Sequence, residues 1–217
     1  MTAGVRERRL TVRTDPASFR SSVHRYRDSR FNAVAVKVFP GEHYVTNADE
    51  MLVTVLGSCV AACIRDPVVA VGGMNHFMLP ESGGGERGNS DWGEASSGMR
   101  YGNVAMERLI NDILLRGGLR QRLEIKVFGG GNVLGGTSNI GHRNADFVET
   151  YLAAEHLSIA AAELRGTQAR RVHYFPATGR VMVLALRRAE DDAMVERESR
   201  YRSKLQSDPV AGSIELF

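Results

Sequence analysis

Two short apolar runs joined by a turn constrain the fold of this chain more than any other feature. The runs are 59-CVAACIRD-66 and 70-AVGGMNHFML-79, and Pro67-Val68-Val69 separates them. Small and β-branched residues dominate both runs, and an Asp-Pro pair is typical of the first positions of a β-turn. The pattern therefore predicts a β-hairpin whose turn is Asp66-Pro67-Val68-Val69.

The predicted register of this hairpin brings a cysteine and a histidine together. Paired residues of an antiparallel hairpin have a constant sum of positions, and a turn centred between 67 and 68 makes that sum equal to the sum for Cys59 and His76. Paired Cβ atoms on one face lie roughly 4.5–5.5 Å apart, so an imidazole nitrogen can reach a sulfur. A slip of one residue would place the two side chains on opposite faces.

The remaining segments mix strands with helices. Helical spacing of apolar residues, with Asn103 as a cap and Gly117-Gly118 as a stop, predicts one helix, and a second is expected from about Asn144 to His156. This mixture favours an α+β fold, a layered α/β sandwich with mixed sheets and hairpins, over a doubly wound parallel sheet. Strands are expected at 51–58, 123–128, 157–164, 171–175 and 180–186, and as an extended pair around Pro40-Gly41 within 31–47.

Charge divides the chain into three parts. Residues 1–30 carry eight arginines against three acidic residues. They are expected to form a flexible basic arm that mainly solubilises the chain, with an acidic surface as the alternative partner and with no specific nucleic acid and no membrane insertion. Residues 31–188 form the expected domain, and 189–217 form a charged, helical tail. Residues 81–98, rich in Gly and Ser, are expected to form a long loop. The start lacks a signal peptide and no apolar run reaches about 18 residues, so a soluble cytoplasmic protein is expected.

Cys59 and His76 fit two interpretations. A free thiol is mostly protonated at neutral pH, and an adjacent imidazole both generates the thiolate and delivers a proton to a leaving group. Against this, free cysteine is among the most buried residue types and packs as a small apolar side chain. The shared face of the hairpin, and the glycine before Ser58, bring the nucleophile hypothesis level with the packing hypothesis.

Two other kinds of site are weaker. A metal could use Cys59, Cys63, His76 and His142, but residues four apart on a strand are roughly 13 Å apart, too far to share a zinc ion. The glycine-rich 129-GGGNVLGG-136 lacks the Lys-Ser/Thr of a P-loop and the spacing of a dinucleotide fingerprint. Its glycines are better explained by a tight turn or by close approach of another segment. No metal and no organic cofactor is expected.

Four motifs together resemble a known family. LGSCVAACIRDP, VGGMNHFMLP, KVFGGGNVLGG and IGHRN, in this order and at these distances, are similar to the CheD family of chemoreceptor glutamine deamidases, over roughly residues 34–188. The resemblance implies a layered sandwich related to bacterial deamidase toxins. It also implies hydrolysis of glutamine side chains in methyl-accepting chemotaxis receptors to glutamate and ammonia, with a CheC-type phosphatase as a further partner. The alternative is a chemotaxis adaptor that binds receptors or such a phosphatase without catalysis.

The resemblance also implies roles for individual residues. Cys59 of the GSC motif corresponds to the nucleophile, His76 of GGMNHFMLP to the general acid/base, and Thr54 to a third catalytic residue. For the oxyanion, backbone N–H groups near Gly57–Cys59 or in the 129–131 turn are the expected donors. The residues expected to lie beside the substrate or the oxyanion are Gly57, Ser58, Asn75, Gly129 and Gly130.

Overall fold

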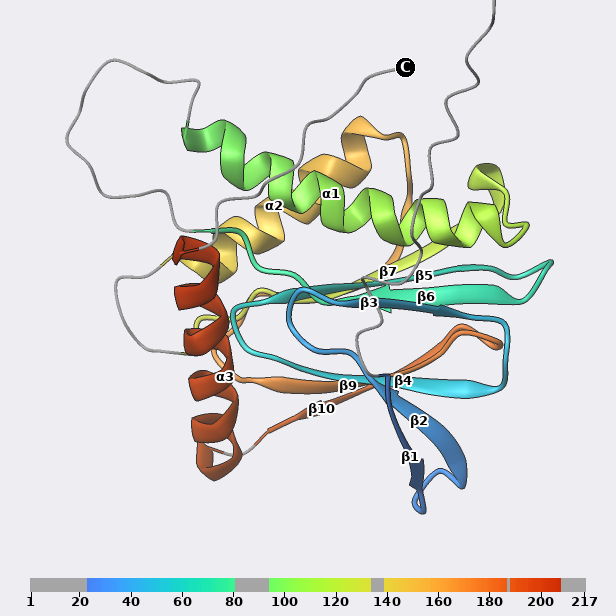
Figure 1. Cartoon of the computed structure of the whole chain (residues 1–217), viewed down its shortest axis with the longest axis horizontal. Helices are drawn as coiled ribbons and strands as arrows, with labels where there is room; N and C mark the ends of the chain where they lie inside the picture. Colours follow the sequence, from blue (N-terminus) through green and yellow to red (C-terminus); the bar gives the residue numbers. More distant parts are fainter. Residues whose placement is uncertain (1–22, 81–93, 134–138, 187, 208–217) are drawn as a thin grey trace, which may run out of the picture.

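A computed structural model describes residues 23–80, 94–133, 139–186 and 188–207 of the chain (Figure 1). Within these ranges the chain forms three α-helices, one short 3-10 helix and ten strands arranged in two sheets. The helices are α1 (Glu94–Leu115), η1 (Arg120–Arg122), α2 (Ile140–Ala154) and α3 (Arg188–Ser207). The strands are β1 (His24–Asp28), β2 (Ala33–Lys37), β3 (His43–Thr46), β4 (Glu50–Leu56), β5 (Val60–Asp66), β6 (Val71–Asn75), β7 (Glu124–Gly129), β8 (Ile159–Leu164), β9 (Arg170–Phe175) and β10 (Arg180–Ala185).

Both sheets are mixed. The first has the order β1-β2-β4-β9-β10, with β2 and β4 parallel, and the second has the order β3-β6-β5-β7-β8, with β7 and β8 parallel. The two sheets stack, α1 and α2 cover the outer face of the second sheet, and α3 stands at one end of the stack (Figure 1). This confirms the predicted α+β sandwich of mixed sheets.

Strand β5 shows why the sequence folds into three layers. Successive side chains of a strand point to opposite faces, so a run that is apolar at every position is buried on both sides. Val60, Ala62 and Ile64 belong to the core between the second sheet and the helices. Their neighbours Cys59, Ala61 and Cys63 belong to the core between the two sheets.

The β5–β6 hairpin forms, but its predicted register is wrong by two residues. The ladder pairs Asp66 with Val71, and an isolated bridge joins Val60 to Phe77, so Cys59 is not directly opposite His76. The turn comprises 67–70 because Ala70 adopts a positive φ of 52° and the Asp66 carboxylate accepts a hydrogen bond from the N–H of Val68. Since side chains alternate with a period of two, a two-residue shift keeps Cys59 and His76 on the same face.

Three element predictions need correction. The segment 31–47 is not one extended pair, because β2 lies in the first sheet and β3 in the second. Helix α1 begins at Glu94 rather than at Asn103, and α2 begins at Ile140 rather than at Asn144. Gly102 lies inside α1, and a Cβ at this position would come within 2.4 Å of the Phe147 ring. Packing between the two helices therefore requires a glycine at this position, although glycine is a poor helix former.

The predicted ends of the domain are only partly visible. Of the arm, residues 1–22 lie outside the described residues, and His24–Asp28 form an edge strand that pairs with β2. Of the loop at 81–98, residues 81–93 lie outside the described residues and the rest are helical. The boundaries at 30 and 188 stay predictions.

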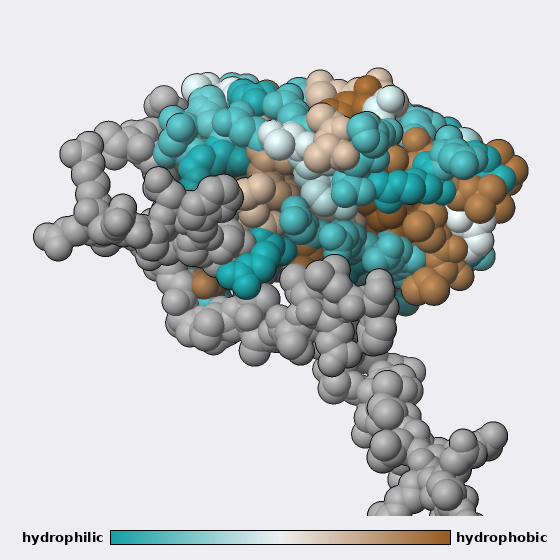
Figure 2. Space-filling view, turned by 90° about the horizontal axis from the view of Figure 1, so that it is seen from above, coloured by the Kyte–Doolittle hydropathy of each residue, from teal (hydrophilic) through white to brown (hydrophobic). Residues whose placement is uncertain are grey.

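The surface over the helices is mainly hydrophilic (Figure 2). Apolar side chains gather toward the end away from α3, where the β5–β6 turn and the end of α1 carry the exposed Val68 and Leu115. Within the part of the chain that the structure describes, none of the helices combines the length and the apolar character needed to cross a membrane.

Candidate active site

Cys59 lies where the chain passes from one sheet to the other. Strand β4 ends at Leu56 in the first sheet and β5 begins at Val60 in the second, so the short segment 57–59 makes the crossing. Gly131 N donates to Gly57 O at 2.7 Å, and Gly130 N donates to Cys59 O at 2.7 Å. These bonds turn the carbonyl groups of Gly57 and Cys59 toward the end of β7.

The carbonyl between them is held by α2. The side-chain amide of Asn144 donates to Ser58 O at 2.8 Å and its oxygen accepts the N–H of Leu79 at 2.9 Å. With the carbonyls of residues 57–59 engaged on one side, the N–H groups of the same three residues are free to converge on the other. Such a concave arrangement of successive N–H groups binds anions.

The anion bound there is a carboxylate of the protein itself. Glu198 of α3 accepts the N–H groups of Gly57 at 2.8 Å, Ser58 at 2.9 Å and Cys59 at 3.2 Å. The hydroxyl of Ser58 also donates to it at 2.6 Å. The two carboxylate oxygens thus accept four hydrogen bonds, and we call the three N–H groups with the Ser58 hydroxyl the anion nest.

His76 follows β6 and is oriented by Thr54 of β4. The Thr54 hydroxyl lies 2.7 Å from Nδ1 of His76 and 2.8 Å from Val38 O. A hydroxyl carries a single proton, and a carbonyl can only accept, so Thr54 donates to Val38 O and accepts from Nδ1–H. Among the described residues Nε2 has no hydrogen-bond partner, and in this tautomer its lone pair is available as a base.

The three functional groups are buried and adjacent. One ligand atom from each of Cys59, His76 and Glu198 lies within 4.8 Å of those of the other two, and all three side chains are almost fully buried. Cys59 and His76 therefore come together as predicted, although through diagonal rather than direct pairing. Both side chains extend from the same face of the second sheet toward the first.

Burial and the neighbouring carboxylate set the charge of the pair. Burial raises the pKa of the Cys59 thiol well above its usual range, and the charge of Glu198 together with its hydrogen bond raises it further. Burial lowers the pKa of His76 to about 4, although Glu198 and the Val38 carbonyl oppose the shift. With α3 in place, the site at neutral pH thus holds a neutral thiol and a neutral imidazole.

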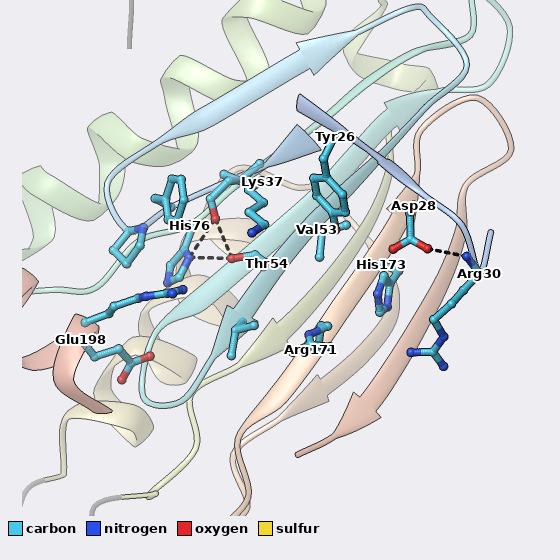
Figure 3. A pocket seen from close by; sticks show the side chains of 15 residues that line it. Tyr26, Asp28, Arg30, Lys37, Val53, Thr54, His76, Arg171, His173 and Glu198 are labelled. Atoms are coloured by element: carbon cyan, nitrogen blue, oxygen red, sulfur yellow. Dashed lines mark hydrogen bonds between the residues drawn. The ribbon is translucent and has the colours of Figure 1, made fainter. Parts of the chain in front are cut away.

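A cavity of about 360 Å³ opens beside this pair. Thr54, His76 and Glu198 line one end of it, and from there it extends along the first sheet toward β1 and β9 (Figure 3). Four cationic side chains contribute to its lining, against the carboxylates of Asp28 and Glu198. These cations are Arg30, Lys37, Arg171 and Arg197.

Other predicted site residues have positioning contacts. Asn75 is buried, its oxygen accepts the N–H of Ala62 at 2.8 Å, and its amide donates to Ala105 O at 3.1 Å, so it ties β5 to α1. Gly129 and Gly130 hold the cysteine segment from behind: a Cβ on Gly129 would lie 2.2 Å from Cys59 O. Because Gly130 N already donates to Cys59 O, the donors that face the cleft are those of residues 57–59.

Among the described residues, one group of cysteine, histidine and acidic side chains lies close enough together to hold a metal ion. It consists of Cys59, His76 and Glu198. Neither Cys63 nor His142 belongs to it. Cys63 packs in the core between the sheets, where burial raises the pKa of its thiol. Each oxygen of Glu198 already accepts two hydrogen bonds. The hydrogen-bond donors around this carboxylate therefore form a site for an anion rather than for a metal cation.

Sequence reasoning missed Glu198 and Asn144. Glu198 lies about 140 positions from the segment it binds, within a charged helix whose pattern marks no residue as buried. From the sequence, Asn144 is expected near the start of the second helix, with no role in the site. The one available signal was the IGHRN motif, which ends at Asn144.

Comparisons with known proteins point to one family. A family model described as "CheD chemotactic sensory transduction" matches residues 78–185. A protein of Rhodopseudomonas palustris (strain BisA53) is 70% identical over 98% of this chain and 99% of its own length. Proteins of Janthinobacterium sp. (strain Marseille) and Saccharophagus degradans are each 51% identical, over 88% and 91% of this chain and 93% and 91% of their own lengths. All three carry the name "Probable chemoreceptor glutamine deamidase CheD". The chain belongs to the CheD family.

Proposed function

We propose that this chain is a protein-glutamine deamidase that converts glutamine side chains of chemoreceptors to glutamate with release of ammonia. The observation that carries the proposal is the grouping of a thiol, an imidazole with a free Nε2 and an anion nest within one buried site. Relatives that match nearly the whole chain bear the corresponding name. The substrate would be reached in the cytoplasm, on the part of the receptor that extends there.

The first half of the reaction is acylation of Cys59. Nε2 of His76 takes the thiol proton while Sγ attacks the carboxamide carbon, which becomes tetrahedral and places its negative charge on oxygen. The N–H groups of Gly57 and Cys59 bind that oxyanion, in the position where both now bind Oε1 of Glu198. Collapse breaks the C–N bond, and His76 returns the proton to the departing ammonia, which leaves a thioester.

The second half is hydrolysis of that thioester. His76, neutral again, takes a proton from water, and the resulting hydroxide attacks the thioester carbon. The oxyanion forms once more in the nest, the C–S bond breaks, and the proton passes from His76 to the Cys59 sulfur. Thr54 acts as a positioning residue throughout, since it touches Nδ1 of His76 rather than the reacting atoms.

Charge in the cavity supports a macromolecular, acidic substrate. Lys37 of β2 and Arg171 of β9 lie on the first sheet and Arg30 follows β1, where residues next to the target glutamine would contact them, whereas Arg197 belongs to α3. A small amide would not need this extended cationic lining. Arg171 of β9 lies between His76 and Arg30 (Figure 3).

Mass spectrometry of a purified receptor cytoplasmic fragment tests the proposal. We expect defined glutamines to become glutamates with the wild-type chain and with Cys63→Ala, and to stay unchanged with Cys59→Ala. Retained ammonia release by Cys59→Ala would refute the mechanism. Binding of the fragment without conversion by the wild type would indicate the adaptor instead. A CheC-type phosphatase as partner stays a prediction, which co-purification with such a protein would test.

A further inference from the structure

Glu198 holds an unusual position for a residue of a charged helix. It is 4% exposed, and it is the one fully buried side chain among residues 196–205, the part of α3 whose side chains the structure describes. An ionised carboxylate loses its hydration on burial, and this cost is offset only when its oxygens are fully hydrogen-bonded. The four donors of the anion nest meet that requirement.

The group bound in the nest is chemically the product of glutamine deamidation. A glutamine side chain that has lost ammonia is a glutamate side chain, and Glu198 places such a carboxylate against the N–H groups of residues 57–59 and beside the Cys59 sulfur. The same N–H groups would bind the oxyanion of the reaction. A substrate carboxamide and Glu198 therefore cannot occupy the site together.

Other side chains of α3 also contact the body of the domain. Tyr201 lies against Gly41 and its hydroxyl contacts the hydroxyl of Tyr101, while Leu205 packs at the edge of the core between the sheets. Both side chains are only partly buried. Glu196 and Arg200 pair with each other on the exposed side of the helix. Glu198, Tyr201 and Leu205 are thus among the side chains that dock the helix over the active site.

We infer that α3 is an intramolecular product mimic, which occupies the substrate site of this enzyme with Glu198 until a helical segment carrying a glutamine displaces it. The inference rests on the proposed function for the identity of the substrate. Its geometric basis is independent: the nest accepts a side chain of glutamate length from a helix that lies across the end of the two sheets (Figure 1). The site is therefore shaped for residues presented by a helix.

Displacement of α3 would also activate the nucleophile. The carboxylate of Glu198 contributes to the raised pKa of Cys59, by its charge and by a hydrogen bond. Its departure leaves the N–H groups of the nest facing an empty site next to the sulfur, and these groups favour the thiolate. Substrate entry and thiol activation are thus coupled to one movement.

The test is the rate of alkylation of Cys59 by iodoacetamide in the full-length chain. We expect Glu198→Ala to react about tenfold faster than the wild type or more, because the thiol is both more accessible and more acidic. Glu196→Ala, which alters an exposed carboxylate two residues away, should react like the wild type. Fragment ions separate Cys59 from Cys63, which serves as the buried internal reference. EDTA in every sample removes any metal ion held by the three side chains.

A second variant guards against misfolding of the first. Tyr201→Ala loosens α3 without touching the nest, so it should also accelerate alkylation of Cys59 while thermal unfolding shows an intact core. Wild-type rates in Glu198→Ala, or in Tyr201→Ala if the former does not fold, overturn the inference whatever happens to a receptor fragment. Faster alkylation would support α3 as the product mimic even if no variant deamidates the receptor fragment. In that case the receptor is not the substrate of the enzyme.

Discussion

The hydroxyl of Thr54 accepts a hydrogen bond from Nδ1 of His76 at 2.7 Å. It does so because its own proton is committed to the carbonyl of Val38, 2.8 Å away. One threonine thereby fixes both the orientation of the imidazole and its tautomer, with the free lone pair on Nε2. A carboxylate usually has this role beside a catalytic histidine. Here two neutral groups have it, the Thr54 hydroxyl and the buried Val38 carbonyl that accepts its proton.

Replacement of Thr54 should separate this positioning role from packing. We expect Thr54→Val, which keeps the shape of the side chain, to lower kcat about ten- to a hundredfold because His76 loses its preferred tautomer and orientation. Thr54→Ser keeps the hydroxyl and should restore most of the activity. The measurement is ammonia release across a pH series. Full activity in Thr54→Val would assign Thr54 to packing alone.

The pH dependence of stability follows from the burial of His76. Its pKa is lowered to about 4 in the folded state from 6.5, so the unfolded chain binds more protons between these values. The free energy of unfolding should therefore fall by about 3 kcal/mol as the pH falls from 6.5 to 4, and His76 should contribute no slope above that window. Urea unfolding of the wild type and of His76→Gln measures this.

The comparison between these two proteins isolates one group. His43 and His173 also have a lowered pKa, because burial removes hydration from both rings, and they give the wild type additional loss of stability in the same direction. Their contribution remains in His76→Gln, so only the difference between the two curves belongs to His76. Parallel curves would mean that the imidazole is hydrated in solution.

Local patterns predicted the layers and the shared face of the reactive pair. The run 59–66 predicted a strand of a hairpin, and β5 is that strand, with side chains of its apolar part, residues 59–64, in the cores on both faces. The two-residue error in hairpin register arose at Ala70, whose positive φ of 52° no residue preference indicated. The grouping of Cys59 with His76 survived this error because it depended on the parity of the register rather than on its value.

Contacts between distant segments were beyond such reasoning. The nest of residues 57–59 exists because the 129–131 turn and Asn144 hold its carbonyl groups from the opposite side. Glu198 reaches it from a helix whose sequence is evenly polar. No local preference specifies either arrangement, since each depends on where separate elements pack.

The glycine-rich turn behind the cysteine segment should be intolerant of a side chain. Gly129 has a φ of 110°, and a Cβ there would lie 2.2 Å from Cys59 O. We expect Gly129→Ala to lower the free energy of unfolding by about 3 kcal/mol or more and to abolish activity. Gly117→Ala is the matched control, because its φ is 96° but open space surrounds the added Cβ, and it should cost about 1 kcal/mol. Equal losses would show that backbone strain alone matters at Gly129.

The cationic lining of the cavity should govern binding of the receptor. We expect Arg171→Gln to raise KM several-fold at low ionic strength with little change in kcat, because the residue lies beyond the dyad. Screening by salt should bring the wild type toward the variant. Arg116→Gln removes a cation that pairs with Asp112 on α1, away from the cavity, and provides the control. Identical salt dependence in all three proteins would exclude electrostatic steering by this surface.

The position of Glu198 leads to a prediction that needs no receptor. In Glu198→Gln a carboxamide replaces the carboxylate in the anion nest, beside the Cys59 sulfur and the free Nε2 of His76. This variant should deamidate itself: Cys59 attacks the carbon of the amide, ammonia leaves, and water releases glutamate at position 198. A chymotryptic fragment ending at Tyr201 would report the change in mass. In Cys59→Ala/Glu198→Gln the glutamine should persist, which separates catalysis from spontaneous loss of ammonia. Persistence of glutamine in the single variant would show that Glu198 binds the nest in a pose that a substrate does not share.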